Sequence, residues 1–407
     1  MKEEQFLSGC AQEKEKTMKG FETDFNFCTT TQIILEAGGS QRLGELCRPF
    51  NARSVVLITD PGLKKLGLVD SAYNSLSEAG LNVTLFSEVE ADPSDNTVLL
   101  AVELAKSVQA DIIIGVGGGS SMDVAKLVAL LANPKSTQTL SDIYGVDQVQ
   151  DQRLPLIQVP TTAGTGSEVT TIAIVTTGNT TKSGIVSQRL LPDLALLDAE
   201  LTLGLPATVT AATGIDAMVH AIEAYTSHIK KNPLSDLLAK EALKLLATNI
   251  STAVHQGQNM TARSSMLLGS TLAGQAFANA PVAAVHALAY PLGGHFHIPH
   301  GLSNSLLLPA VLRFNAEAAK HLYAELASIL VTEPLAKNST EQTEQFINTI
   351  ENLIDNLGLP TQLRDMGISE DALPMLAKDA MQQQRLLINN PRVVSEADAL
   401  AIYKSIY

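Results

Sequence analysis

The sequence predicts an α/β domain followed by an all-helical domain. Short apolar runs alternate with amphipathic helical patterns in the first half of the chain, which is typical of a parallel sheet covered on both faces. From about Pro206 onward the hydrophobic period is 3.6 residues almost throughout. With 407 residues, 45% of them hydrophobic and 17% charged, the chain is long and apolar enough for a large core in each part. We expect an extension over 1–26, the α/β domain over 27–205 and the helical domain over 206–407.

The individual elements follow from local patterns. Apolar runs predict strands at 31–35, 54–59, 82–86, 111–115, 156–159 and 193–198. Helix starts are indicated by Pro61 after Asp60, by Ser94 before an acidic residue, and by the Ser120-Ser121 pair. Long helical patterns cover 211–226, 233–254, 260–278 and 316–331. Two such domains leave a cleft between them, which is where ligand sites tend to form.

Composition excludes several classes of partner. The 28 Lys and Arg against 42 Asp and Glu give a net charge of -14, which repels nucleic acid and anionic membrane surfaces. Apolar stretches such as 112–116 are too short to span a bilayer. Cys10, Cys28 and Cys47 show no CxxC spacing, so neither a disulfide framework nor a cysteine zinc site is expected. The stretch before Phe27 lacks the apolar region of a secretory signal. We expect a cytoplasmic protein.

A glycine-rich loop follows the strand predicted at 111–115. The strand runs into Gly117, Gly118 and Gly119, and a helix is expected to open at Ser120 or Ser121. Glycines let backbone N–H groups approach a phosphate, and a helix N-terminus adds partial positive charge. The loop matches neither G-x-G-x-x-G nor a P-loop. The segment therefore predicts a pyrophosphate site, with a tight turn that binds nothing as the alternative.

Two further polar positions lie at predicted strand ends. The segment 160–168, Pro-Thr-Thr-Ala-Gly-Thr-Gly-Ser-Glu, offers hydroxyls suited to phosphate, ribose or a nicotinamide amide, although a solvated turn has the same composition. Asp60 ends the second predicted strand. A carboxylate there can accept both hydroxyls of an adenosine ribose and repel a 2'-phosphate. A plain helix cap explains Asp60 equally well.

Histidines and a carboxylate form a candidate metal site. Asp216 and His220 are four residues apart in a helical pattern and share a face. Such a pair is usually a surface or capping interaction. However, four of the eight histidines fall between His286 and His300 in mostly apolar surroundings, where an unpartnered imidazole is costly. A carboxylate with imidazoles suits a divalent transition metal. Because the set contains no thiolates, the ligand types do not discriminate between Fe(II) and Zn. His295 and His297, within the same segment, are interpreted as ordinary residues.

At these motifs the sequence resembles the iron-containing (group III) alcohol dehydrogenase family. The resemblance runs from about Phe27 to the C-terminus and rests on four motifs in family order and spacing: 117–123, 160–168, 214–220 and 286–301. It implies a Rossmann-like N-terminal domain, a helical C-terminal domain, an active site in the cleft between them, and a homodimer.

Position by position, the resemblance implies roles for individual residues. The metal ligands would be Asp216, His220, His286 and His300, holding Fe(II) or alternatively Zn. NAD would be bound by Asp60, Gly117, Gly118, Gly119, Ser120, Asp123, Thr161, Thr162, Thr165 and Lys182. The candidate catalytic residue is Tyr290. Many members carry a histidine at this position, often placed to help relay the substrate proton, and a phenol is a poorer relay near neutral pH.

The implied reaction is hydride transfer between a small primary alcohol, or its aldehyde, and NAD, with the metal polarising the substrate oxygen. Two alternatives stay open at this point. One is a hydroxyacid-oxoacid transhydrogenase of the same family, which keeps its cofactor bound. The other is a lyase of the dehydroquinate-synthase type, which needs many basic residues, whereas the segments here are apolar.

Overall fold

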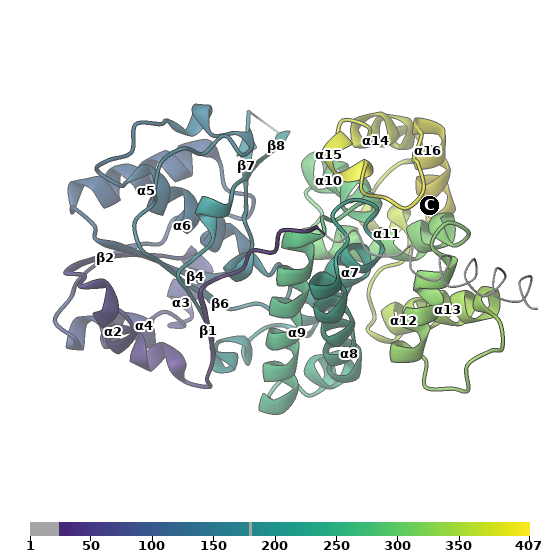
Figure 1. Cartoon of the computed structure of the whole chain (residues 1–407), viewed down its shortest axis with the longest axis horizontal. Helices are drawn as coiled ribbons and strands as arrows, with labels where there is room; N and C mark the ends of the chain where they lie inside the picture. Colours follow the sequence, from purple (N-terminus) through teal and green to yellow (C-terminus); the bar gives the residue numbers. More distant parts are fainter. Residues whose placement is uncertain (1–23, 179–180) are drawn as a thin grey trace, which may run out of the picture.

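The computed structural model describes residues 24–178 and 181–407. Figure 1 shows two parts side by side: an α/β part in purple and blue, and a helical part in green and yellow. The predicted extension over 1–26 lies almost wholly outside the described residues, so its role stays a prediction. The described segment after it reaches across to the helical part, where the Cys28 N–H donates to Asn279 Oδ1 at 2.7 Å. Within the described ranges, no helix combines the length and hydrophobicity needed to cross a membrane.

A six-stranded parallel sheet forms the α/β part. In spatial order its strands are β1 (Gln32–Leu35), β9 (Leu194–Leu197), β6 (Leu156–Pro160), β4 (Ile112–Gly117), β2 (Ser54–Ile58) and β3 (Asn82–Phe86). Each lies within two residues of a predicted strand. The prediction succeeds because strands buried on both faces are nearly continuous apolar runs.

Helices cover both faces of this sheet. The helices of this part are α2 (Leu43–Leu46), α3 (Pro61–Lys65), α4 (Asp70–Glu78), α5 (Asp95–Ser107) and α6 (Gly119–Leu131). Val56 and Ile113 pack with residues of α5 and α6 on one face. Val55 and Leu57 pack with residues of α2 and α4 on the other. The alternation along β2 places neighbouring side chains on opposite faces, as strand geometry requires.

The strand register brings the predicted cofactor loops together. Ile58 of β2 lies opposite Gly115 of β4, and Gly117 of β4 lies opposite Pro160 of β6. Because parallel strands end at the same edge, the residues after β2, β4 and β6 emerge side by side. Ligands of open α/β sheets bind at this carboxyl edge.

A second sheet was not predicted. It contains β5 (Gly145–Val146), β8 (Thr181–Val186) and β7 (Ile172–Thr177), with β7 and β8 antiparallel. Both longer strands contain threonines, β8 contains Gly184, and β7 is only partly buried. β8 therefore lacks the apolar run that indicated the main strands. β7 begins with the apolar run 172–175, but no strand was predicted between 160 and 193, so both strands were missed.

The helical part follows β9 and begins with α7. Its helices are α7 (Ala207–Thr226), α8 (Pro233–His255), α9 (Met260–Asn279), α10 (Ala284–Phe296), α11 (His300–Asn315), α12 (Lys320–Leu330), α13 (Ser339–Asn356), α14 (Leu373–Ala380), α15 (Gln384–Leu387) and α16 (Glu396–Ser405). The four predicted patterns correspond to α7, α8, α9 and α12. Two starts differ: α7 begins four residues earlier than predicted, and α12 begins at Lys320 rather than at 316. One apolar cluster joins helices from α7 to α16.

Candidate functional site

The glycine loop joins β4 to α6 with very little side-chain bulk. Helix α6 begins at Gly119, with Gly118 as its N-cap and no capping side chain, so the predicted start at Ser120 or Ser121 was one to two residues late. A Cβ added to Gly119 would lie 2.9 Å from Thr165 Cγ2. The position therefore requires glycine for close packing. The first N–H groups of α6 are left for a ligand, as an anion site at a helix N-terminus requires.

The loop over 160–168 packs directly on the glycine loop. The Thr161 N–H donates to the Gly117 carbonyl at 3.0 Å. Thr165 lies against Gly119, and a Cβ built on Gly118 would meet Thr162 Oγ1 at 3.7 Å. The structure thus brings the predicted threonines and glycines into one surface at the carboxyl edge of the sheet.

Asp60 lies at the same edge and caps α3. Its Oδ1 accepts from the Leu63 N–H at 3.0 Å, and its backbone is extended, as is usual for an N-cap. The cap uses one of the two carboxylate oxygens. Capping and binding a ribose are therefore compatible in this geometry.

Asp123, predicted to contact the cofactor, forms hydrogen bonds within the protein. Its Oδ1 accepts from Ser167 Oγ at 2.6 Å, and its Oδ2 accepts from the Ile174 N–H at 2.9 Å. It joins α6 to the second loop and to β7. Asp123 also lines the cavity described below, but its direct bonds point to positioning of the loop.

Lys126 belongs to the same network and was missed by sequence analysis. Its ammonium is fully buried and donates to Ser167 Oγ at 2.8 Å, to Thr170 Oγ1 at 3.0 Å and to the Ile172 carbonyl at 2.6 Å. Burial lowers its pKa, against the opposing effect of Asp123. A lone lysine in an otherwise apolar stretch of α6 was the available sequence signal.

Lys182 projects from β8 toward the cavity. Its Nζ forms an ion pair with Asp92 and donates to Thr176 Oγ1 at 3.3 Å. Lys182, Asp92 and His300 line the same cavity. Lys182 was predicted as a cofactor residue only from the family resemblance. It comes from the second sheet, which was not predicted.

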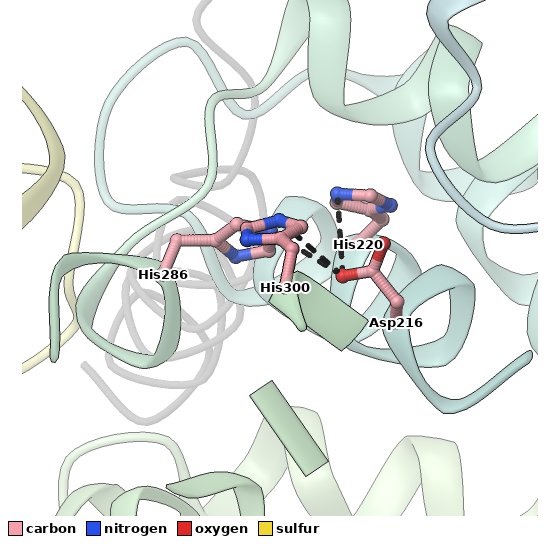
Figure 2. Close-up of side chains that lie close together, drawn as sticks. All are labelled: Asp216, His220, His286 and His300. Atoms are coloured by element: carbon pink, nitrogen blue, oxygen red, sulfur yellow. Dashed lines mark ion pairs between the residues drawn. The ribbon is translucent and has the colours of Figure 1, made fainter. Parts of the chain in front are cut away.

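Four side chains from three helices converge in the helical part. Asp216 and His220 come from α7, His286 from α10 and His300 from the first position of α11. One potential ligand atom from each lies within 4.8 Å of all the others. Asp216 Oδ1 is 4.0 Å from His220 Nε2, 3.9 Å from His286 Nε2 and 3.7 Å from His300 Nε2. Figure 2 shows the three imidazoles gathered around this carboxylate.

Second partners fix the orientation of two of the imidazoles. His220 Nδ1 donates to the Gly164 carbonyl at 3.2 Å, and His286 Nδ1 donates to Glu223 Oε2 at 2.7 Å. In each ring the other nitrogen, Nε2, faces Asp216. Metal-binding histidines usually have such a partner. Glu223, which also accepts from the Ala283 and Val285 N–H groups, was missed although it lies one helical turn after His220.

The electrostatics of the cluster favour cation binding. Burial lowers the pKa of His220 to about 3. Desolvation by the cavity walls also lowers the pKa of His300, although 40% of its side chain is exposed. Both imidazoles are therefore neutral near neutral pH, with lone pairs available. Burial opposes ionisation of Asp216, but the surrounding imidazoles and Asn304 lower its pKa overall. A buried carboxylate among neutral imidazoles is a donor set suited to a divalent transition metal.

The surroundings of the cluster are largely apolar. The ring of Phe277 stacks on His220 with centroids 4.3 Å apart, and His286 stacks on the same imidazole at 4.7 Å. His295 and His297 lie outside the cluster, as expected. His295 Nε2 is 2.9 Å from Asp379 Oδ2 near the surface, and His297 is the C-cap of α10.

One cavity is lined by the glycine loop and by the three histidines of the cluster. Its lining includes Gly119 and Ser120 at one end and His286 and His300 at the other. Tyr290 also lines it, with its ring centroid 6.1 Å from that of His300. Burial raises the pKa of the Tyr290 hydroxyl, although Arg385 opposes this effect. A nucleotide on the loop and a cation on the donors would therefore face a common space.

Comparison with known proteins agrees with this arrangement. The family model "Iron-containing alcohol dehydrogenase" matches residues 30–199, and "Fe-containing alcohol dehydrogenase family, C-terminal" matches residues 210–407. Long-chain-alcohol dehydrogenase 1 of Geobacillus thermodenitrificans is 41% identical over 371 residues, which are 91% of this chain and 93% of that protein. The 1,3-propanediol dehydrogenase of Klebsiella pneumoniae is 37% identical over 371 residues, 90% of this chain and 94% of that protein.

Solved structures give the same result. The crystal structure of a 1,3-propanediol oxidoreductase matches with a TM-score of 0.91 and 36% identity, covering 94% of this chain and all of the other. An alcohol dehydrogenase from Oenococcus oeni matches with a TM-score of 0.90 and 32% identity, with the same coverage. Since matched models and relatives extend over both parts of the fold, the chain belongs to the iron-containing alcohol dehydrogenase family and is an oxidoreductase of the alcohol–aldehyde type.

Proposed function

We propose that the enzyme interconverts small primary alcohols and their aldehydes with NAD, using a divalent metal held by Asp216, His220, His286 and His300. One observation carries the proposal: His220, His286 and His300 line the same cavity as Gly119 and Ser120 of the glycine loop, and the potential ligand atoms of these three histidines and Asp216 lie within 4.8 Å of one another. Relatives named as an NAD-dependent methanol dehydrogenase from Bacillus methanolicus and as 1,3-propanediol dehydrogenases support the reaction class. Neither the transhydrogenase nor the lyase alternative gains support from the relatives found.

The cofactor side of the site works through backbone groups. The first N–H groups of α6, at Gly119 and Ser120, would bind the pyrophosphate, and Thr165 packs beside them. Asp60 would accept the adenosine ribose hydroxyls with the oxygen that does not cap α3. Lys182 would lie on the ribose side of the nicotinamide half. These residues orient NAD, which supplies the hydride acceptor.

The metal side of the site works through side chains. Asp216, His220, His286 and His300 would hold a divalent cation, which would supply polarisation of the substrate oxygen. Phe277 and Ile298 contribute apolar lining that limits water. Tyr290 keeps its proton at neutral pH because burial raises its pKa. It is therefore placed to donate a hydrogen bond near His300 rather than to act as a strong base.

The decisive experiment is a substrate panel with metal analysis of the same preparation. Primary alcohols of increasing length, 1,3-propanediol and a 2-hydroxyacid are offered with NAD, and NADH absorbance is followed. We expect turnover of primary alcohols that falls when a chelator removes the metal and returns when it is restored. Hydroxyacid turnover without added NAD would instead indicate the transhydrogenase, and absence of NADH with every alcohol would refute the proposal.

We further propose that the enzyme is a cytoplasmic homodimer. The dimer is implied by the resemblance to the family, and the location is inferred from the cysteine pattern. Light scattering during size-exclusion chromatography tests the first point, and a mass equal to one chain would refute it. Fractionation of the source cells tests the second.

A further inference from the structure

Asn304 lies among the four donors without having been predicted as part of the site. Its side chain is fully buried. Nδ2 donates to Asp216 Oδ1 at 2.6 Å and lies 3.2 Å from His286 Nε2 and 3.3 Å from His300 Nε2. One amide nitrogen thus contacts the donor atoms of three helices at once.

The backbone is arranged so that this contact is possible. Asn304 lies four residues after His300 on α11 and therefore shares its helix face. A Cβ added to Gly301 would lie 2.6 Å from the Ala212 carbonyl oxygen of α7. Because Gly301 has no side chain, α11 approaches α7 closely. The amide then reaches the carboxylate of Asp216.

The hydrogen bonds of Asn304 leave part of its own side-chain amide unsatisfied. Within residues 24–178 and 181–407, its buried Oδ1 has no hydrogen-bond partner, and such an unpaired group costs stability. Asn315, on the same helix, differs: its amide exchanges reciprocal bonds of 2.9 and 2.8 Å with Asn390. Asn315 is a satisfied structural amide, whereas every bond of Asn304 goes to a candidate metal donor.

We propose that Asn304 is a positioning residue of the metal site, an inference that rests on the proposed metal ligands. Its carboxamide holds the Asp216 carboxylate in place. The bond to Asp216 is compatible with cation binding because a carboxylate oxygen has more than one lone pair. Each imidazole Nε2 has a single lone pair, so its longer contact with Asn304 would be given up to a bound cation, whereas the bond to Asp216 would remain.

Removing the amide should therefore weaken metal binding. Loss of a residue that orients metal ligands typically costs about 10- to 100-fold in affinity. We expect Asn304→Leu, which keeps a similar volume, to raise the dissociation constant for Co(II) by about tenfold or more. The absorption spectrum of bound Co(II) should also change, because the carboxylate is no longer held in one orientation.

The test uses the full chain freed of metal by a chelator and titrated with Co(II) against a chromophoric competitor. Asn315→Leu is the matched control and should keep wild-type affinity and spectrum. His220→Ala reports on the site itself and should lose binding. If Asn304→Leu folds poorly, Asn304→Ala provides the same comparison.

The outcomes separate the two proposals. Wild-type or tighter Co(II) binding by the folded Asn304 variant, together with loss in His220→Ala, would overturn the role of Asn304 and leave the metal site intact. Wild-type binding by His220→Ala would overturn the metal site itself and, with it, this inference. Equal weakening in Asn304→Leu and Asn315→Leu would show a general effect on the fold and would also overturn the role of Asn304.

Discussion

The two ends of the cavity are built on different principles. At the cofactor end, Gly118 and Gly119 contribute backbone, and the neighbouring loop packs so closely on Gly119 that a Cβ there would lie 2.9 Å from Thr165 Cγ2. At the metal end, four side chains from three helices contribute the chemistry, and His220 and His286 are each fixed by a second partner. The cofactor end should therefore be sensitive to added atoms, and the metal end to removed ones.

The largest effect is expected from removing a donor. His220→Ala should abolish stoichiometric bound metal and lower turnover by about a thousandfold or more, because the substrate oxygen loses several kcal/mol of charge stabilisation. Metal analysis and NADH production on the same sample measure both effects. His295→Ala, which removes an imidazole bonded near the surface to Asp379, should keep its metal. Full activity in metal-free His220→Ala would contradict the assignment.

The next largest effect concerns Asp60 and the choice of nucleotide. Asp60→Asn preserves an N-cap acceptor but removes the charge that would repel a 2'-phosphate. We expect the NAD over NADP preference in kcat/KM to shrink by about tenfold or more, since repulsion at a few ångströms amounts to one to a few kcal/mol. Asp60→Gly removes the cap as well and should also lower thermal stability. An unchanged NAD over NADP ratio of kcat/KM in both variants would show that Asp60 is only a helix cap.

A smaller effect is expected from adding a methyl group at the cofactor end. Gly119→Ala places a Cβ 2.9 Å from Thr165 Cγ2, and relieving such a contact costs about 1–3 kcal/mol. The KM for NAD should rise by about tenfold while metal content stays at the wild-type level. Gly204→Ala, where an added Cβ meets nothing within 4 Å, is the matched control. Equal KM values for NAD in the two variants would refute the proposal that the loop binds the cofactor.

Tyr290→Phe should have an effect of only several-fold on turnover, the size of one hydrogen bond. Burial raises the Tyr290 pKa above its ordinary value of 10.0, so the phenol stays protonated between about pH 6 and pH 9. The pH dependence of kcat in that range should be the same for both proteins. A titration step present in the wild type and lost in the variant would show that Tyr290 relays the proton.

The smallest effect is expected from truncation. Removing residues 1–23 should change kcat/KM by less than about twofold, since this densely charged segment precedes the family resemblance. The deletion must stop before Cys28, which bonds to Asn279 of α9. Loss of turnover with intact NAD binding would reveal a role for the segment.

The same contrast explains how far the sequence could be interpreted. The six main strands are apolar runs and the glycine loop is a local motif, so both were predictable from neighbouring residues. The strands β7 and β8 are partly polar and were not predicted. The spacing of Asp216 and His220 and the histidine cluster indicated a metal site, and the family resemblance selected its four members. The sequence did not predict roles for Glu223, Asn304 and Lys126, because these roles arise only from contacts between distant helices and loops.

The bond from His220 to the Gly164 carbonyl joins the two ends of the cavity. Gly164 belongs to the loop that packs on Gly118 and Gly119, and a Cβ there would lie 2.8 Å from Thr213 Cβ of α7. Any ligand that shifts this loop would therefore also shift one imidazole of the candidate metal site. The affinities for cation and nucleotide would then be coupled by the same factor in both directions, through a single carbonyl group.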